Sequence, residues 1–101
     1  MNDQAILNLL GLAFRAQKVV SGFDLVLQAI AHQRVSFVFV AQETSPKTLK
    51  ELQYQLSKTK IPSFQKFSQA QLSKAIGRSR KIIAITDPGF AKRFQELVTK
   101  N

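Results

Sequence analysis

Helix-like and strand-like hydrophobic patterns alternate along the whole sequence of 101 residues. Residues 3–14 carry apolar side chains at the three- and four-residue spacing of an amphipathic helix, and residues 17–20 form a short strand-like segment. Residues 35–41 are apolar almost throughout, which is typical of a central strand that is covered on both faces. A chain that alternates in this way can bury its apolar side chains by packing helices on both faces of a sheet.

Capping residues predict where the later helices begin. Four pairs carry this signal: Ser21 with Asp24, Ser45 with Pro46, Ser68 with Gln71, and Asp87 with Pro88. The first and third pairs have the spacing of a capping box, and the second and fourth place proline at the first helical position. Gly77 is in position to end the helix that Ser68 opens. Residues 61–67 and 81–86 form two more strand patterns, and Pro62 restricts the first of them to an edge or entry position.

The predicted order of elements is α-β-α-β-α-β-α-β-α, with short connections. This order indicates the α/β class, in the form of a three-layer α/β/α sandwich around a four-stranded sheet. The length predicts a single domain, residues 1–101. Hydrophobic residues make up 45% of the sequence, which is enough to build a core for such a domain.

The charge of the chain is strongly positive. Fifteen lysines and arginines face six acids, which gives a net charge of +9. Seven basic residues and no acid lie in one stretch of the second half: Lys58, Lys60, Lys66, Lys74, Arg78, Arg80 and Lys81. Such an excess favours a nucleic acid or another polyanion as the partner. The alternative is a solvated face that only keeps the protein soluble.

The inventory of reactive side chains argues against catalysis. The sequence holds no cysteine, so disulfides, thiolate metal sites and thiol nucleophiles are excluded. His32 is the only histidine, and the acids are few and scattered, which leaves no candidate catalytic pair or metal cluster. The glycines form neither a dinucleotide-binding pattern nor a P-loop. We therefore expect no enzymatic activity, no metal site and no cofactor.

No part of the chain is expected to enter a membrane. Residues 1–4 lack the positive charge of a signal peptide, and the apolar stretch that follows them is interrupted by Asn8 and ends at Arg15. No apolar run in the sequence approaches the length that spans a bilayer. These features lead us to expect a cytoplasmic protein.

Two segments are candidates for binding a polyanion. The segment from Gly77 to Lys81 joins a helix to an apolar strand, so it should be a surface loop, and its arginines can bind phosphate or stack on an unpaired base. Gly22 opens a helix whose free N–H groups could hold a phosphate. The alternatives are a loop that is merely polar and a glycine that merely makes a turn.

Four stretches of the chain carry a resemblance to a known family. They are residues 9–16, residues 18–22, residues 72–77 and residues 84–91. Through them the chain resembles the YlxQ-type bacterial proteins of the kink-turn-binding ribosomal protein superfamily (the L-seven-Ae and L-thirty group). The resemblance implies an α/β/α sandwich whose four-stranded sheet is mixed. It also implies RNA binding without catalysis.

The resemblance places a specific RNA-binding motif at the start of the second helix, and this chain departs from it. Kink-turn binders carry Gly-x-Asn-Glu-x-x-Lys there. Only Gly22 matches, because Asp24, Leu25 and Gln28 occupy the Asn, Glu and Lys positions. A second RNA-contacting loop of the family, which precedes the last strand, is apolar with an acid. In this chain the segment from Gly77 to Lys81 takes its place and is basic. These departures favour a binder that depends on phosphate contacts or recognises a different RNA feature.

We therefore expect a non-catalytic RNA-binding protein, a monomer, that binds ribosomal RNA, the ribosome or a translation-related protein. The resemblance implies that Lys18 is a basic residue at the RNA surface. The predicted RNA-binding residues are Lys18, Ser21, Gly22, Asp24, Gln28, Lys74, Gly77, Arg78, Ser79, Arg80 and Lys81. The alternative function is a protein-interaction adaptor on the same fold that docks on an acidic protein partner.

Overall fold

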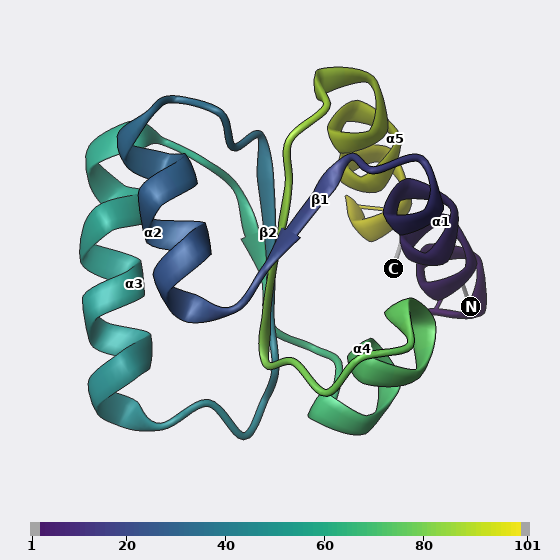
Figure 1. Cartoon of the computed structure of the whole chain (residues 1–101), viewed down its shortest axis with the longest axis horizontal. Helices are drawn as coiled ribbons and strands as arrows, with labels where there is room; N and C mark the ends of the chain where they lie inside the picture. Colours follow the sequence, from purple (N-terminus) through teal and green to yellow (C-terminus); the bar gives the residue numbers. More distant parts are fainter. Residues whose placement is uncertain (1–2, 100–101) are drawn as a thin grey trace.

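The computed structural model describes residues 3–99, and helices and strands alternate along this range (Figure 1). The elements are α1 (Asp3–Arg15), β1 (Val19–Ser21), α2 (Phe23–Ala31), β2 (Phe37–Val40), α3 (Pro46–Thr59), β3 (Ser63–Phe64), α4 (Gln69–Ile76), β4 (Ile82–Ile85) and α5 (Pro88–Thr99). The predicted order of elements is confirmed.

The four strands form one mixed sheet in the order β1-β4-β2-β3. Strand β4 pairs antiparallel with both β1 and β2, so that Ala84 lies opposite Val20 on one side and Val38 on the other. Strand β3 pairs parallel with β2. Strand β1 is therefore an edge strand, although it is the first strand of the chain.

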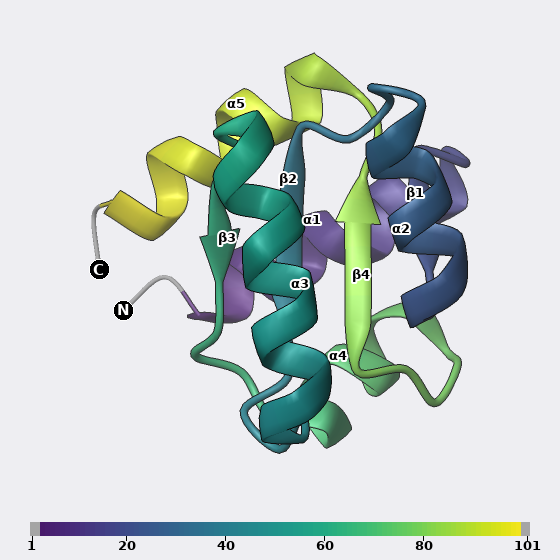
Figure 2. The same cartoon turned by 90° about the vertical axis from the view of Figure 1, so that its left-hand side faces the viewer.

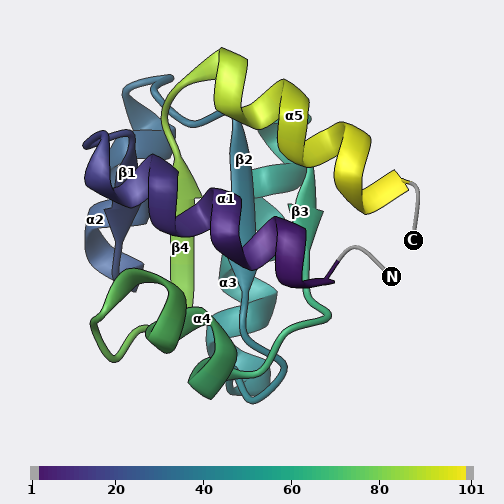
Figure 3. The same ribbon diagram turned by 90° about the vertical axis from the view of Figure 1, so that its right-hand side faces the viewer.

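Helices cover both faces of the sheet and complete three layers. Helices α2 and α3 lie on one face, and α1, α4 and α5 lie on the other (Figures 1, 2 and 3). Alternate residues of the central strands point to opposite faces: Phe37 and Phe39 pack with the three-helix layer, whereas Val38 and Val40 pack with the two-helix layer. The predicted three-layer α/β/α sandwich is confirmed.

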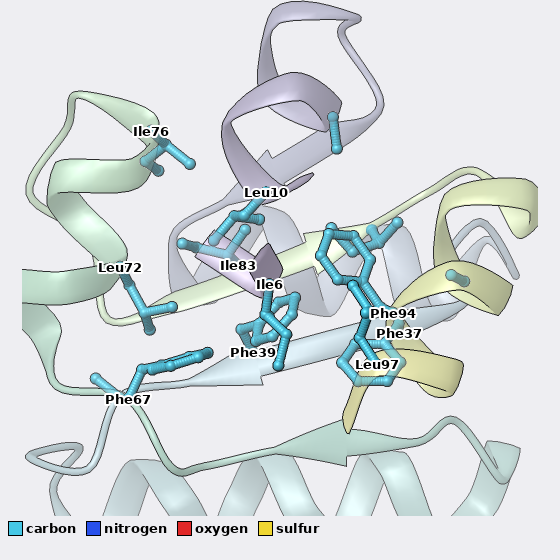
Figure 4. Packing of buried hydrophobic residues seen from close by; sticks show 14 residues of the cluster. Ile6, Leu10, Phe37, Phe39, Phe67, Leu72, Ile76, Ile83, Phe94 and Leu97 are labelled. Atoms are coloured by element: carbon cyan, nitrogen blue, oxygen red, sulfur yellow. The ribbon is translucent and has the colours of Figure 1, made fainter. Parts of the chain in front are cut away.

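Phenylalanine rings fill the core on the three-helix side (Figure 4). Phe39 lies at the centre of this group, with its ring centroid 5.0 Å from the rings of Phe37 and Phe94 and 6.3 Å from that of Phe67. Several of the contacts are tilted or edge-to-face, the arrangements that aromatic quadrupoles favour. The packed rings lie against the three-helix face of β2 and β4.

The strands are shorter than the sequence patterns predict. Strand β1 begins only at Val19, because Gln17 has a φ of 61° and closes α1 with a left-handed turn. Strand β3 is confined to Ser63–Phe64, since Phe67 leaves the sheet and its carbonyl accepts a hydrogen bond from the Gln42 N–H. The ends of a strand depend on pairing partners, which the hydrophobic pattern alone does not encode.

Three of the four predicted helix starts are confirmed. Ser45 accepts a hydrogen bond from the Thr48 N–H, Ser68 and Gln71 form a complete capping box, and Asp87 Oδ2 accepts one from the Phe90 N–H. The capping box of Ser21 and Asp24 was predicted wrongly. Ser21 still belongs to β1, opposite Ile83, and Gly22 is the N-cap of α2 without a side-chain cap.

Candidate nucleic-acid interface

The start of α2 and the connection from α4 to β4 lie side by side at one end of the sheet, the lower end in Figure 1. The Gly22 N–H donates a 2.9 Å hydrogen bond to the carbonyl of Ile82, the first residue of β4. Residues 22 and 82 are 60 positions apart in sequence, and the pairing of β1 with β4 brings them together. The two segments singled out in the sequence therefore form one surface.

Gly22 has a conformation that opens this surface. Its φ of 96° and ψ of 143° lie in a region that only glycine adopts readily. A Cβ atom at this position would lie 3.9 Å from Arg80 Nε, so the arginine side chain passes close to the glycine. Because no side chain caps α2, the N–H groups of its first turn remain available at this end.

Hydrogen bonds fix the loop between α4 and β4. Gly77 ends α4 in the left-handed region with a φ of 74°. The Arg80 N–H donates to Ser73 Oγ at 3.0 Å, and the Ser73 hydroxyl donates to the Arg80 carbonyl at 3.2 Å. The Arg78 guanidinium lies over the ring of Phe14, 5.6 Å from its centroid. The basic loop is thus tied to α4 and to α1.

A hollow of about 370 Å³, which we call the helix-start hollow, lies beside this loop. Its lining comprises Gly22, Phe23, Thr44, Ser45, Thr48, Gln69, Ser79, Arg80, Lys81 and Ile82. Helices α2, α3 and α4 all begin at it, so the positive ends of three helix dipoles converge with the charges of Arg80 and Lys81. Glu43 offsets part of this potential, because its carboxylate accepts a 2.8 Å hydrogen bond from the Gln69 N–H.

A second hollow, of about 560 Å³, follows the open edge of β1, and we call it the edge hollow. It is lined by Phe14, Arg15, Gln17, Val19, Val20, Ser21, Leu25, Arg78 and Arg80. Arg80 lines both hollows and so joins them into one basic surface. Arg15 in turn connects the edge hollow to a groove between α1 and α4, which Lys74 also lines.

The structure brings some of the predicted RNA-binding residues together on one surface. Six predicted residues line one or both hollows: Ser21, Gly22, Arg78, Ser79, Arg80 and Lys81. Lys74 lies in the α1–α4 groove, whereas Asp24, Gln28 and Gly77 are exposed and line neither hollow. The carbonyl of Lys18 accepts from the Thr86 N–H, which places Lys18 at the far end of β1, about 10 Å along the strand from Ser21.

Several residues of this surface were missed by the sequence reasoning. Phe14 was assigned only to the first helix, Arg15 was named only as the end of the apolar stretch, and Leu25 was named only as a departure from the family motif. Arg15 lies inside a stretch that carries the family resemblance, which is the signal that could have marked it. Leu25 is 56% exposed because it lies off the stripe of Val26, Ala29 and Ile30 that faces the sheet, and this helical spacing is the signal that could have marked it.

The cations of this surface have no ion-pair partner among the described residues 3–99. Within residues 3–99, Arg15, Arg78, Arg80 and Lys81 form no ion pair with a carboxylate, and the Arg93–Glu96 pair lies elsewhere, on α5. The same range contains no cluster of acids and histidine that could hold a metal ion. None of its helices combines the length and the apolar character needed to cross a membrane.

The basic stretch from residue 58 to residue 81 does not form a single surface. Lys58 lines a separate hollow with Ile30, Gln33 and Ile61, beyond the C-terminal end of α2. Gly22 marks the opposite end of the same helix. The surface at the hollows therefore consists of Arg15 and the basic residues of the α4–β4 loop rather than of the whole stretch.

Comparison with known proteins links this geometry to a family. Residues 4–95 match the model of the ribosomal protein L7Ae/L30e/S12e/Gadd45 family. A protein of Enterococcus faecium named RNA-binding protein YlxQ is 39% identical over 97 residues, which cover 96% of this chain and 94% of the relative. A protein of the same name from Bacillus subtilis (strain 168) is 40% identical, with 89% of this chain and 91% of the relative covered.

Solved structures share the fold. A protein of unknown function from Bacillus halodurans superposes with a TM-score of 0.89 at 29% identity, covering 93% of this chain and 96% of its own. The 15.5kD RNA binding protein of Giardia lamblia superposes with a TM-score of 0.83 at 17% identity, covering 99% and 88%. The second likeness concerns the fold alone.

Proposed function

The chain belongs to the ribosomal protein L7Ae/L30e/S12e/Gadd45 family, and on this basis we propose that it is a non-catalytic protein that binds RNA at the two hollows. Both curated relatives are named as RNA-binding proteins. The observation that carries the proposal is the position of Arg80, which lines both hollows, passes beside Gly22 and has no acidic partner within residues 3–99.

The proposed mechanism depends on phosphate contacts. A phosphate against the first turn of α2 would meet main-chain N–H groups and the guanidinium of Arg80, and Lys81 lines the same hollow. The side chains of Thr48 and Ser79 add hydroxyl groups to its lining. Contacts of this kind position an RNA backbone and carry no sequence information by themselves.

We propose structured ribosomal RNA as the target, with the ribosome or its assembly intermediates as the setting and the cytoplasm as the location. Support comes from the family, which is named after ribosomal proteins. The proposal describes one RNA-binding domain that acts as a monomer, and RNA binding at the two hollows would require no residue of a second copy.

The dependence of RNA affinity on salt tests this proposal. We expect Arg80→Gln to weaken binding to a ribosomal RNA fragment and to lower the slope of log K against log salt by roughly 1, because one phosphate contact is lost. Arg34→Gln is the matched control, since Arg34 is exposed just beyond the C-terminal end of α2, away from both hollows. Equal slopes for the two variants would contradict the proposed surface, and an adaptor for an acidic protein would give that result.

A further inference from the structure

We propose that the groove between α1 and α4 binds the bases of a single-stranded RNA segment and favours adenine. The groove has a volume of about 540 Å³, and the two helices that form it lie side by side in the three-helix layer (Figure 3). The inference rests on the proposed RNA binding at the two hollows, where phosphate contacts carry no sequence information. It adds a site at which the base sequence affects affinity.

The groove continues the basic surface of the hollows. Arg15 lines both the groove and the edge hollow, and Lys74 adds a second cation from α4. Neither cation pairs with a carboxylate within residues 3–99, and no acid of this range lines the groove. An RNA strand that leaves the edge hollow therefore meets two positive charges along the groove, and these charges attract its phosphates.

The exposed face of α1 has an unusual composition for a surface helix. Gln4, Asn8 and Leu12 are exposed, yet no charged residue occurs between Asp3 and Arg15. The outer face of a surface helix usually carries charged side chains. Amide and apolar side chains suit a ligand that combines a polar edge with an apolar face, and an unpaired nucleobase has both.

The amide side chains of the groove have hydrogen-bonding groups to spare. Gln4 Nε2 donates to Asn8 Oδ1 at 2.8 Å, which leaves Gln4 Oε1 as an acceptor and Asn8 Nδ2 as a donor without a partner among residues 3–99. Gln71 Oε1 accepts from the Ser68 N–H at 2.9 Å, which leaves Gln71 Nε2 as a second donor. One donor beside one acceptor matches adenine, whose edge offers an N–H group beside a ring nitrogen.

Apolar side chains supply a surface for the face of the base. Leu12 is 50% exposed, and Leu7 and Ala75 are partly buried in the same lining. The two helices approach closely at Gly11, where a Cβ atom would lie 3.1 Å from the Ala75 carbonyl oxygen. A purine covers more of this apolar surface than a pyrimidine does, which adds to the preference for adenine over uracil.

RNA probes that differ only in their single strands test the inference. One hairpin of ribosomal RNA is extended at both ends with adenosines, with uridines or with abasic ribose phosphates, and a further probe is the bare hairpin. We expect the wild-type protein to bind the adenosine form at least about fivefold more tightly than the uridine or abasic form. The NMR signals of the Asn8 side-chain amide should shift with the adenosine form and not with the abasic form.

Asn8→Ala removes one hydrogen-bonding amide without changing the charge. This variant should bind the adenosine form only as tightly as the abasic form, and it should bind the bare hairpin as the wild-type protein does. Gln53→Ala is the matched control, because Gln53 is an exposed amide on α3 that lines neither the groove nor the two hollows.

The outcomes separate the two proposals. The base-binding inference is overturned if the wild-type protein binds the adenosine form no more tightly than either other extended form, or if Asn8→Ala keeps the preference. A groove that binds a peptide instead of RNA would give equal affinities for the three forms. In these cases, binding of the bare hairpin leaves the proposed function in place. If the wild-type protein binds none of the probes, the proposed function fails and the inference fails with it.

Discussion

The backbone at Gly22 takes a conformation that residues with a Cβ atom avoid, and the side chain of Arg80 lies beside it. Both residues were candidates from the sequence, one as a helix start and the other as part of a basic loop. Their contact was not predictable, because it depends on the pairing of β1 with β4. The sequence therefore indicates which single residues could bind a phosphate, but it does not indicate which of them lie side by side.

Gly22→Ala should destabilise the protein by about 1–3 kcal/mol, because the φ of 96° places an alanine in a strained region. The free energy of unfolding, measured with urea by circular dichroism, checks this. Gly77→Asn serves as the comparison, since Gly77 has a φ of 74° in the left-handed region, which asparagine tolerates, and open space around its Cβ position. Equal losses in the two variants would show that Gly22 is not a specially constrained position.

Helix α4 and the loop that follows it act as one unit through Ser73. This side chain holds the main chain of Arg80 with two hydrogen bonds, and a further one joins Gln69 Nε2 to Ser79 Oγ at 3.2 Å. The segment from Gly77 to Lys81 was predicted to be a loop at the molecular surface. The structure agrees, since Arg78 and Lys81 are exposed and Arg80 is partly exposed. The bonds that orient it were not foreseen, since serine at a helical position has no distinctive pattern.

Ser73→Ala should lower stability by roughly 1 kcal/mol and weaken RNA binding several-fold, although it removes no charge. The physical reason is that the Arg80 backbone loses its anchor to α4, which leaves the guanidinium less well positioned. Thermal unfolding and RNA titration at one salt concentration measure the two effects. Ser57→Ala is the control, because the Ser57 hydroxyl donates to the Tyr54 carbonyl on the exposed face of α3 and lines neither hollow. RNA affinity that stays at the wild-type value in Ser73→Ala would argue against this positioning role.

The elements and most of the helix starts were predictable, whereas the ends of the strands were not. Capping side chains at Ser45, Ser68 and Asp87 mark helix starts through local hydrogen bonds, so the sequence contains the information. Ser21 has the same residue type and failed as a cap, because the ladder with β4 extends through it. Competition between a local cap and a long-range strand pair is decided by tertiary structure.

At the scale of the whole molecule, the sheet order determines which charges meet. Because β4 lies between β1 and β2, the loop before β4 lies next to the start of α2, and the last turn of α1 joins the same surface through Arg15. The charge of +9 indicated a polyanion, but the basic stretch of the sequence is dispersed: Lys58 lies beyond the C-terminal end of α2, Lys74 in the groove between α1 and α4, and Arg80 and Lys81 at the start of α2. The number of charges in the sequence predicts a polyanionic partner, but it does not predict which basic residues form the surface at the two hollows.

RNA crosslinking in cells, followed by sequencing of the bound fragments, shows whether the α4–β4 loop binds ribosomal RNA. The wild-type protein is compared with a variant in which Arg78, Arg80 and Lys81 are changed to Glu, and with a control in which the exposed Arg34, Lys58 and Lys92 are changed to Glu. The two variants have the same net charge. The proposed function predicts discrete sites in ribosomal RNA that the control retains and the loop variant loses. Crosslinks that persist equally in both variants, or that are diffuse in the wild-type protein, would contradict it.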